Sequence, residues 1–234
     1  SHDLRSPLAS IKASASSLRQ SDVDWPADVR DEFLQSIELE TDRLTTIVSN
    51  LLDMSRLQAG AVRPVLRPVS LEEVLPAAVL ALGDRAAMVD LVLPAELDDV
   101  LADPALLDRV VANLVANAVE FSPPEHGVRI HATAAQGEVH LYVVDHGPGI
   151  RPRDRATVLQ PFHRLSDSTR SSGVGLGLAI ADGLTRSMGG SLELRDTPGG
   201  GLTALVTLPA VHTPAVTAPE QGTSTSTSTL GTTS

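Results

Sequence analysis

A heptad repeat in the second quarter of the chain constrains the fold more than any other sequence feature. Its positions alternate between spacings of three and four residues, at Leu34, Ile37, Thr41, Leu44, Val48, Leu51 and Ser55. This spacing is typical of a long helix that packs lengthwise against another helix. The repeat stops before Gly60, a residue suited to a helix C-cap. We therefore expect a helix over residues 28–58.

A shorter helix is expected before it, because apolar residues recur with the same spacing at Leu4, Leu8, Ile11, Ala15 and Leu18. Residues 21–26 form a turn-like stretch that ends in a proline suited to a helix start. Two such helices predict an antiparallel hairpin. A single hairpin leaves one apolar side uncovered. Either a second copy, in a four-helix bundle, or the next domain of the same chain can cover that side; we favour the bundle.

The pattern changes after Gly60 to a mixture of helices and strands. Apolar periodicity predicts helices over 71–82, 104–121 and 177–188, and strands over 89–93, 99–101, 128–134, 139–144, 191–194 and 202–208. The fold class is therefore α+β, with about five strands and three main helices on one face. From residue 211 the chain is rich in Thr, Ser, Pro and Gly, which predicts a disordered tail.

Composition excludes several kinds of function. The 18 Lys and Arg residues against 29 Asp and Glu give a net charge of −11. This charge argues against nucleic acid or an anionic membrane as the main partner. The absence of cysteine excludes thiolate metal sites and cysteine nucleophiles. No apolar run of about 18 residues and no signal peptide is present, so we expect a soluble chain.

The first candidate site lies at the start of the first helix. If Leu4 lies on the apolar side, His2 and Asp3 face solvent, where an imidazole can attack a phosphorus atom. Asp3 can orient the ring and take its proton. Ser6 lies one turn after His2 on the same face. Pro7 has no N–H for the carbonyl of Asp3, which predicts a bend.

Two further candidate sites lie in the α/β part. Asn113 and Asn117 are four residues apart on one helix face, and their amide oxygens suit Mg²⁺ held by polyphosphate. Asp145 follows an apolar strand and begins an Asp-x-Gly-x-Gly turn with Gly147 and Gly149. Its carboxylate can accept the amino proton of adenine, and the glycines let the backbone approach the ring.

A fourth candidate is the glycine-rich stretch with Gly173, Gly175, Leu176 and Gly177 directly before a helix. Backbone N–H groups at a helix start can face phosphate. A dinucleotide-binding motif is the obvious alternative. That motif should follow the first strand of a βαβ unit, whereas this stretch comes late and follows a polar loop.

Taken together, these motifs resemble the boxes of sensor histidine kinases in the family's order, over about residues 1–210. Residues 1–8 are similar to the H-box, the asparagine pair to the N-box, the Asp145 turn to the G1 box, the glycine stretch to the G2 box and residues 161–165 to the F-box. The sequence of residues 50–60 resembles that of the potassium-responsive Kdp-type kinases of high-GC Gram-positive bacteria.

The resemblance implies a role for each site residue. His2 would be the phosphoacceptor, Asp3 would assist the transfer, and Ser6 would help to dephosphorylate the partner, although Thr or Asn is commoner there. Asn117 would hold Mg²⁺ and Asn113 would support the phosphates of ATP. The remaining implied contacts are Asp145, Gly147 and Gly149 with adenine, and Gly173, Gly175, Leu176 and Gly177 with phosphate.

The resemblance also implies a lid over the nucleotide at about residues 165–172. Phe162 would anchor this lid, and Arg164 would contact the γ-phosphate. The sequence departs from the family where Glu120 replaces a usual Lys or Arg and where Leu202 replaces a usual hydroxyl residue. A glutamate near phosphates is repulsive, so either it turns outward or it helps to position Mg²⁺ or water.

The expected organisation is a dimerisation and histidine-phosphotransfer hairpin at 1–60, a Bergerat-type ATP-binding α/β sandwich at 61–210, and the tail at 211–234. ATP and Mg²⁺ would be the cofactors, and the partners would be a second copy and the receiver domain of a response regulator. The chain would be the cytoplasmic portion of a protein anchored in the membrane through regions before this sequence. A different ATPase of the same superfamily, or a degenerate nucleotide-binding dimeric scaffold, is the alternative.

Overall fold

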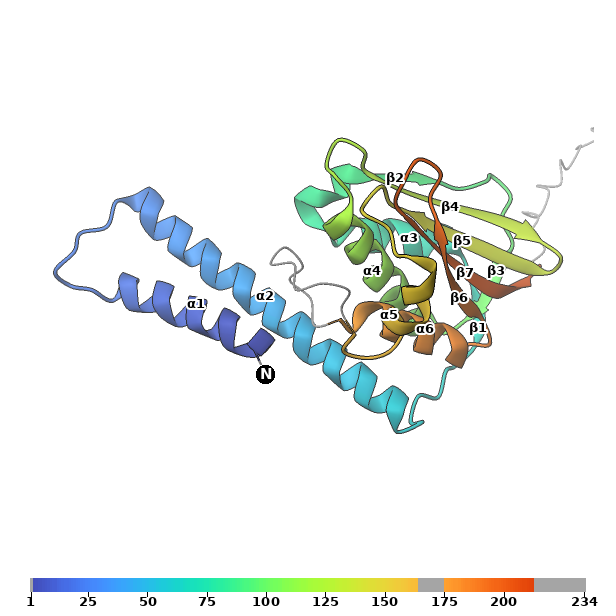
Figure 1. The fold of residues 1–234 in the computed structure, drawn as a ribbon, viewed down its shortest axis with the longest axis horizontal. Coiled ribbons are helices and arrows are strands. Elements are labelled where there is room, and N and C mark those ends of the chain that lie inside the picture. Colours follow the sequence, from blue (N-terminus) through green and yellow to red (C-terminus); the bar gives the residue numbers. More distant parts are fainter. Residues whose placement is uncertain (1, 164–174, 213–234) are drawn as a thin grey trace, which may run out of the picture.

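Two long helices project as a hairpin from an α/β domain in the computed structural model, which describes residues 2–163 and 175–212 (Figure 1). Helix α1 spans His2–Leu18 and helix α2 spans Ala27–Gln58, so the predicted hairpin is confirmed. Pro7 lies inside α1 and does not end it. Gly60 follows α2 with a φ of 60°, the left-handed conformation expected after a helix C-terminus.

The turn of the hairpin is held by an aromatic pair. Trp25 donates a hydrogen bond from Nε1 to the carbonyl of Ser17 at 2.9 Å. Its ring meets Phe33 edge to face, with 5.3 Å between the centroids. The indole therefore ties the end of α1 to the start of α2.

The predicted seam of α2 is only partly covered within the single chain. Leu34 and Val48, both on that seam, are 51% and 50% exposed in the single chain. The buried apolar residues of α2 are Ile47 and Met54, which lie one residue before two of the predicted seam positions. One residue rotates a helical position by about 100°, so Ile47 and Met54 lie on a column beside the exposed seam residues, and Met54 packs in the core of the α/β domain. The helix thus carries two apolar faces, of which one remains exposed.

The α/β domain is built on a seven-stranded sheet, in which six strands match the expected ranges and β1 is additional. Its strands are β1 Arg67–Val69, β2 Val89–Val92, β3 Asp99–Ala102, β4 Val128–Ala135, β5 Glu138–Val144, β6 Ser191–Asp196 and β7 Leu202–Val211. The order is β1-β3-β7-β5-β4-β2, and β6 also pairs with β7. Strand β7 is long enough to pair β6 along its first part and β3 through Ala210 and Val211. Only β2 and β4, of the pairs between described strands, run parallel.

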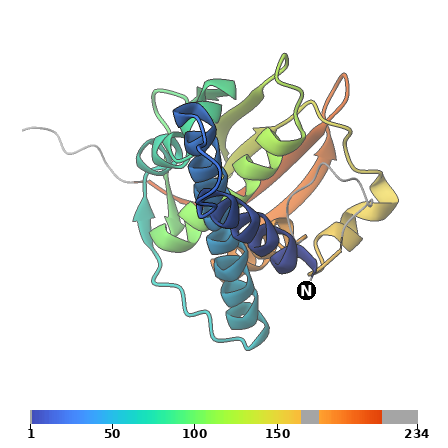
Figure 2. The same cartoon turned by 90° about the vertical axis from the view of Figure 1, so that its left-hand side faces the viewer.

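Three main helices cover the face of the sheet that is turned toward the hairpin (Figures 1 and 2). These are α3 Leu71–Leu80, α4 Pro104–Phe121 and α6 Gly177–Ser187; the shorter elements are η1 Gly83–Met88, η2 Pro152–Asp154 and α5 Arg155–Val158. The α4 residues Leu107 and Leu114 are buried against sheet residues such as Ile130 and Leu141. The α+β fold class is confirmed. None of the described helices combines the length and the hydropathy needed to cross a membrane.

Candidate functional site

Helix α4 begins at a well-capped N-terminus and carries the predicted asparagine pair. Asp103 accepts hydrogen bonds at Oδ1 from the backbone N–H groups of Ala105 and Leu106, at 3.0 and 3.3 Å. Pro104 occupies the first turn, where its missing N–H costs nothing. Since one side of the helix is buried against the sheet, Asn113 and Asn117 lie half-buried beside α6.

The start of α6 lies directly against these two amides. A Cβ at Gly177 would be 3.2 Å from Asn113 Oδ1 and 3.1 Å from Asn117 Nδ2, so only glycine fits without movement. The fold thus brings two sequence-distant motifs together. Amide oxygens are suitable ligands for Mg²⁺, and the residues present therefore fit a magnesium polyphosphate. Leu176, at the N-cap of α6, is buried, and Gly175 has a φ of 73°.

Asp145 is buried to 6% exposure at the end of β5 and is held by the backbone. Its Oδ1 accepts hydrogen bonds from the N–H groups of Gly147 at 2.8 Å and Leu202 at 3.0 Å. Burial raises the pKa of this carboxyl, and the two backbone donors and His146 oppose that rise. Because both hydrogen bonds end on Oδ1, Oδ2 takes part in neither.

Glycines allow the turn after Asp145 to pack closely against its neighbours. Gly149 has a φ of 66°, and a Cβ there would be 2.9 Å from the carbonyl oxygen of Gly201. A Cβ at Gly201 would be only 2.0 Å from the carbonyl oxygen of Asp145. A Cβ at Gly147 would be 2.7 Å from the carbonyl oxygen of Phe121 at the end of α4. Side chains at these positions would therefore displace the aspartate.

Three residues that support the Asp145 turn were missed by sequence reasoning. Leu202 holds Asp145 through its backbone alone, which explains why a hydroxyl side chain is dispensable for this contact. Gly201, whose Cβ position would meet the carbonyl oxygen of Asp145, lies between the two strands predicted at 191–194 and 202–208. Ser122 accepts a hydrogen bond at Oγ from the N–H of His146 at 3.2 Å. Only the position of Ser122 just after the asparagine helix could have indicated it.

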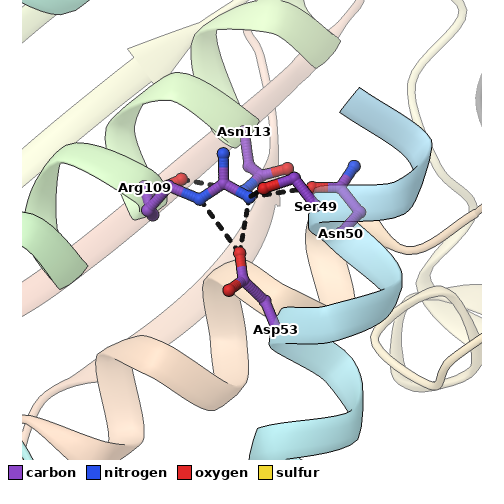
Figure 3. A network of polar contacts seen from close by, with 5 residues as sticks. All are labelled: Ser49, Asn50, Asp53, Arg109 and Asn113. Atoms are coloured by element: carbon purple, nitrogen blue, oxygen red, sulfur yellow. Dashed lines mark hydrogen bonds and ion pairs between the residues drawn. The ribbon is translucent and has the colours of Figure 1, made fainter. Parts of the chain in front are cut away.

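A polar cluster joins α4 to the hairpin, and we call it the Arg109 clamp (Figure 3). Arg109 donates from Nε to Asp53 Oδ2 at 3.0 Å and from Nη2 to Ser49 Oγ at 2.7 Å and Asn50 Oδ1 at 3.5 Å. Asn113 Nδ2 donates to the carbonyl of Arg109 at 2.8 Å. The clamp therefore ties α2 to helix α4 one turn before Asn113, and sequence reasoning missed it.

Glu120, on the same helix as the asparagine pair, forms an ion pair. Its Oε2 lies 3.6 Å from Nη1 of Arg85 in η1. The glutamate that departs from the family pattern is thus balanced by an arginine from another segment.

The remaining predicted site residues are only partly described. Ser6 is exposed on α1, whereas the side chains of His2 and Asp3 lie outside the described part. Phe162 is 57% exposed and has a φ of 63°, so its ring is not buried against the described residues as an anchor would be. The predicted lid, Arg164 and Gly173 also lie outside the described residues, as does the predicted tail from residue 213 on.

Comparison with protein families identifies both parts of the chain. The family described as the His Kinase A (phospho-acceptor) domain matches residues 1–60. The family described as the histidine kinase-, DNA gyrase B- and HSP90-like ATPase matches residues 102–212.

Curated relatives agree with these two matches. Sensor protein KdpD of Mycobacterium tuberculosis H37Rv is 42% identical over 216 residues, covering 90% of this chain and 25% of that protein. Sensor protein KdpD of Rathayibacter rathayi is 49% identical over 166 residues, covering 71% of this chain and 19% of that protein. The chain thus spans a quarter or less of the length of these relatives.

Solved structures show the same arrangement. Full-length ShkA in complex with AMPPNP matches with a TM-score of 0.66 and 28% identity, over 91% of this chain and 45% of that chain. The histidine kinase AdeS of Acinetobacter baumannii matches with a TM-score of 0.66 over 90% of this chain and 98% of that chain; at 19% identity it supports the fold alone. The chain therefore belongs to the sensor histidine kinases, with a phospho-acceptor domain followed by the family's ATPase domain, and it is similar to the KdpD sensor proteins.

Proposed function

We propose that the chain is the catalytic core of a two-component sensor kinase, which phosphorylates its own His2 with Mg-ATP and passes the phosphoryl group to an aspartate of a response regulator. The observation that carries the proposal is the meeting of Gly177 with Asn113 and Asn117, because it sets a helix N-terminus against two amides that suit a magnesium polyphosphate. Family membership supports the same activity.

The proposed division of labour assigns residues 1–60 to the dimerisation and phosphotransfer hairpin, residues 61–210 to ATP binding and residues 211–234 to a tail. The two family matches, at 1–60 and 102–212, support the first two assignments. In the ATP-binding part, Oδ2 of Asp145 accepts the amino proton of adenine, beside the turn of Gly147 and Gly149.

The phosphates lie at the glycine stretch before α6 in this proposal, with backbone N–H groups of Gly173, Gly175, Leu176 and Gly177 facing them. Asn117 holds Mg²⁺ and Asn113 supports the phosphates; when bound, the metal neutralises phosphate charge. Phe162 and Arg164 flank the lid, with Arg164 on the γ-phosphate.

In the transfer step, a ring nitrogen of His2 forms a bond to the γ-phosphorus while the bond from that phosphorus to the bridging oxygen breaks and ADP leaves. Asp3 orients the ring and takes the proton that the attacking imidazole loses. Positioning and charge neutralisation supply most of the acceleration. Ser6 assists the opposing reaction, in which the phosphoryl group is removed from the response regulator.

A second copy of the chain is proposed to cover the exposed apolar face of the hairpin. Five large apolar side chains there are between 46% and 56% exposed: Leu8, Leu34, Val48, Leu51 and Leu52. A four-helix bundle would bury such a face. We further propose that the chain is the cytoplasmic portion of a longer, membrane-anchored sensor, since it covers only 25% of a KdpD relative.

Incubating the purified chain with Mg²⁺ and ATP labelled at the γ-phosphate tests the proposal. We expect an acid-labile protein label that disappears in His2→Gln and persists in His212→Gln, a control at the exposed end of β7. ATP turnover without protein label would instead favour another ATPase of the superfamily. The absence of both protein label and ATP turnover would favour a degenerate scaffold.

A further inference from the structure

We propose that Arg85, positioned by Glu120, supplies the phosphate-binding cation that helix α4 itself lacks. The inference rests on the proposed function, because it concerns the same nucleotide site. It makes Arg85 a nucleotide-binding residue and Glu120 its positioning residue.

The first step is the location of Glu120. It follows Asn117 by three residues and Asn113 by seven, so all three side chains project from one side of α4. Neighbours at this spacing have Cβ atoms roughly 5–6 Å apart. A lone carboxylate at this position would repel a polyphosphate held by the two amides.

The second step is the pairing of that carboxylate. Arg85 Nη1 lies 3.6 Å from Glu120 Oε2, so a guanidinium meets the carboxylate that stands within one helical turn of Asn117. The Arg85 side chain is 56% exposed. A guanidinium has five donors in a fixed fork, so one carboxylate leaves donors that can reach a phosphate.

The third step is how the fold holds Arg85 there. Gly83 begins η1 with a φ of 60°, which turns the chain sharply after α3. The other end of η1 abuts the loop after α4, where a Cβ at Gly127 would be 2.7 Å from the carbonyl oxygen of Met88. The Met88 end of η1 is thereby held against the loop that follows α4.

The fourth step concerns the basic residue that α4 does carry. Arg109 is the one Lys or Arg in the α4 sequence, and it is engaged by Asp53, Ser49 and Asn50 of the hairpin. It is therefore committed to the Arg109 clamp. A cation for the phosphates beside Asn117 has to come from another segment, and η1 brings one.

Nucleotide affinity tests the inference, with Mg-ATP and adenosine as separate probes in calorimetric titrations of the purified chain. Arg85→Ala should weaken Mg-ATP binding about tenfold, as expected for one lost charged hydrogen bond, and leave adenosine binding unchanged. The control is Arg129→Ala, which breaks another exposed ion pair, with Asp90 on β2, and should leave both affinities unchanged.

A second variant tests whether Arg85 supplies a cation to the phosphates or only forms a structural ion pair with Glu120. Adding Glu120→Arg to Arg85→Ala places the guanidinium on α4 itself and should restore Mg-ATP affinity to within about twofold of the parent, because the lost charge is replaced. Equal Mg-ATP affinity of Arg85→Ala and the parent, or equal losses for ATP and adenosine, would overturn the inference. So would failure of the double variant to regain affinity while its melting temperature matches that of Arg85→Ala.

These outcomes are distinct from failure of the proposed function. If the parent chain binds Mg-ATP and labels His2 but Arg85→Ala has no effect, only the role of Arg85 is refuted and the proposed function stands. A parent chain that does not bind Mg-ATP refutes the proposed function and this inference together.

Discussion

The α/β domain and the hairpin bury their apolar residues in different ways. The domain encloses a core of its own, in which Leu107, Val110 and Ile130 are 0% exposed. The long hairpin buries two apolar residues of α2, and one of them, Met54, belongs to the core of the α/β domain. The difference teaches that the domain can be stable by itself, whereas the outer hairpin depends on what covers its exposed leucines.

The two regions meet through a small mixed contact. A Cβ at Gly183 of α6 would be 2.9 Å from Leu57 Cδ1, so the base of α2 packs closely on α6. The Arg109 clamp adds charged hydrogen bonds beside this apolar contact. The clamp and Asn113 lie one turn apart on α4, so the contact with the hairpin and the candidate site are neighbours on the same helix.

The largest effect is expected from a cavity in the core of the α/β domain, which tests the contrast between this core and the exposed hairpin. Leu107→Ala should lower the free energy of unfolding by about 2–5 kcal/mol, because a fully buried leucine loses contacts that the surroundings cannot replace. Chemical denaturation measures this change. The matched control is Leu39→Ala at 70% exposure, and we expect it to change the free energy by less than about 0.5 kcal/mol. Similar losses in both variants would contradict the contrast between the regions.

A change at Asp145 should separate stability from binding within the domain. Since burial raises the pKa of Asp145 in the folded protein, ionisation costs stability above its unfolded pKa, and protonation relieves that cost as the pH falls. Asp145→Asn keeps an Oδ1 acceptor for Gly147 and Leu202, so stability at neutral pH should stay equal or rise. Mg-ATP affinity should fall at least about tenfold, because an amide N–H₂ cannot accept from adenine.

Thermal melting and nucleotide titration at pH 7 measure both quantities. In the parent chain, affinity should also decline on acidification at a pH above the usual aspartate range, and Asp145→Asn should lose that dependence. A strongly destabilised Asp145→Asn, or one with unchanged affinity, would argue against the proposed adenine contact.

The smallest expected effect concerns the join between the regions. Arg109→Ala should cost about 1 kcal/mol, because the pair with Asp53 is partly exposed and solvent screens it. Hydrogen exchange should report faster opening of the α2 residues near Ser49, with little change in the strands of the domain. Arg109→Lys serves as the control because it keeps the charge but loses the forked geometry. Uniformly faster exchange across the chain would mean that the clamp does not act locally.

Much of the fold was predictable because local pattern and tertiary structure agree. Helix α4 spans Pro104–Phe121 as predicted, since its apolar face, N-terminal proline and capping aspartate all act within the helix. The short strand β1 was not among the predicted strands, because three residues carry no usable alternation and the strand is defined by pairing with β3. Part of the α2 seam remains exposed in the single chain, because the helix has two apolar faces and periodicity alone does not say what covers each one.

The sequence by itself determined the order of the motifs, the long helices and the residue types available for phosphate and metal chemistry, because spacing along a helix and glycine before a helix are local properties. Tertiary structure alone decided that Gly177 meets the asparagine pair, that Leu202 holds Asp145, and that Arg85 and Arg109 reach Glu120 and Asp53. Those contacts join segments distant in sequence, and they form only when sheet pairing and core packing fix the helices in place.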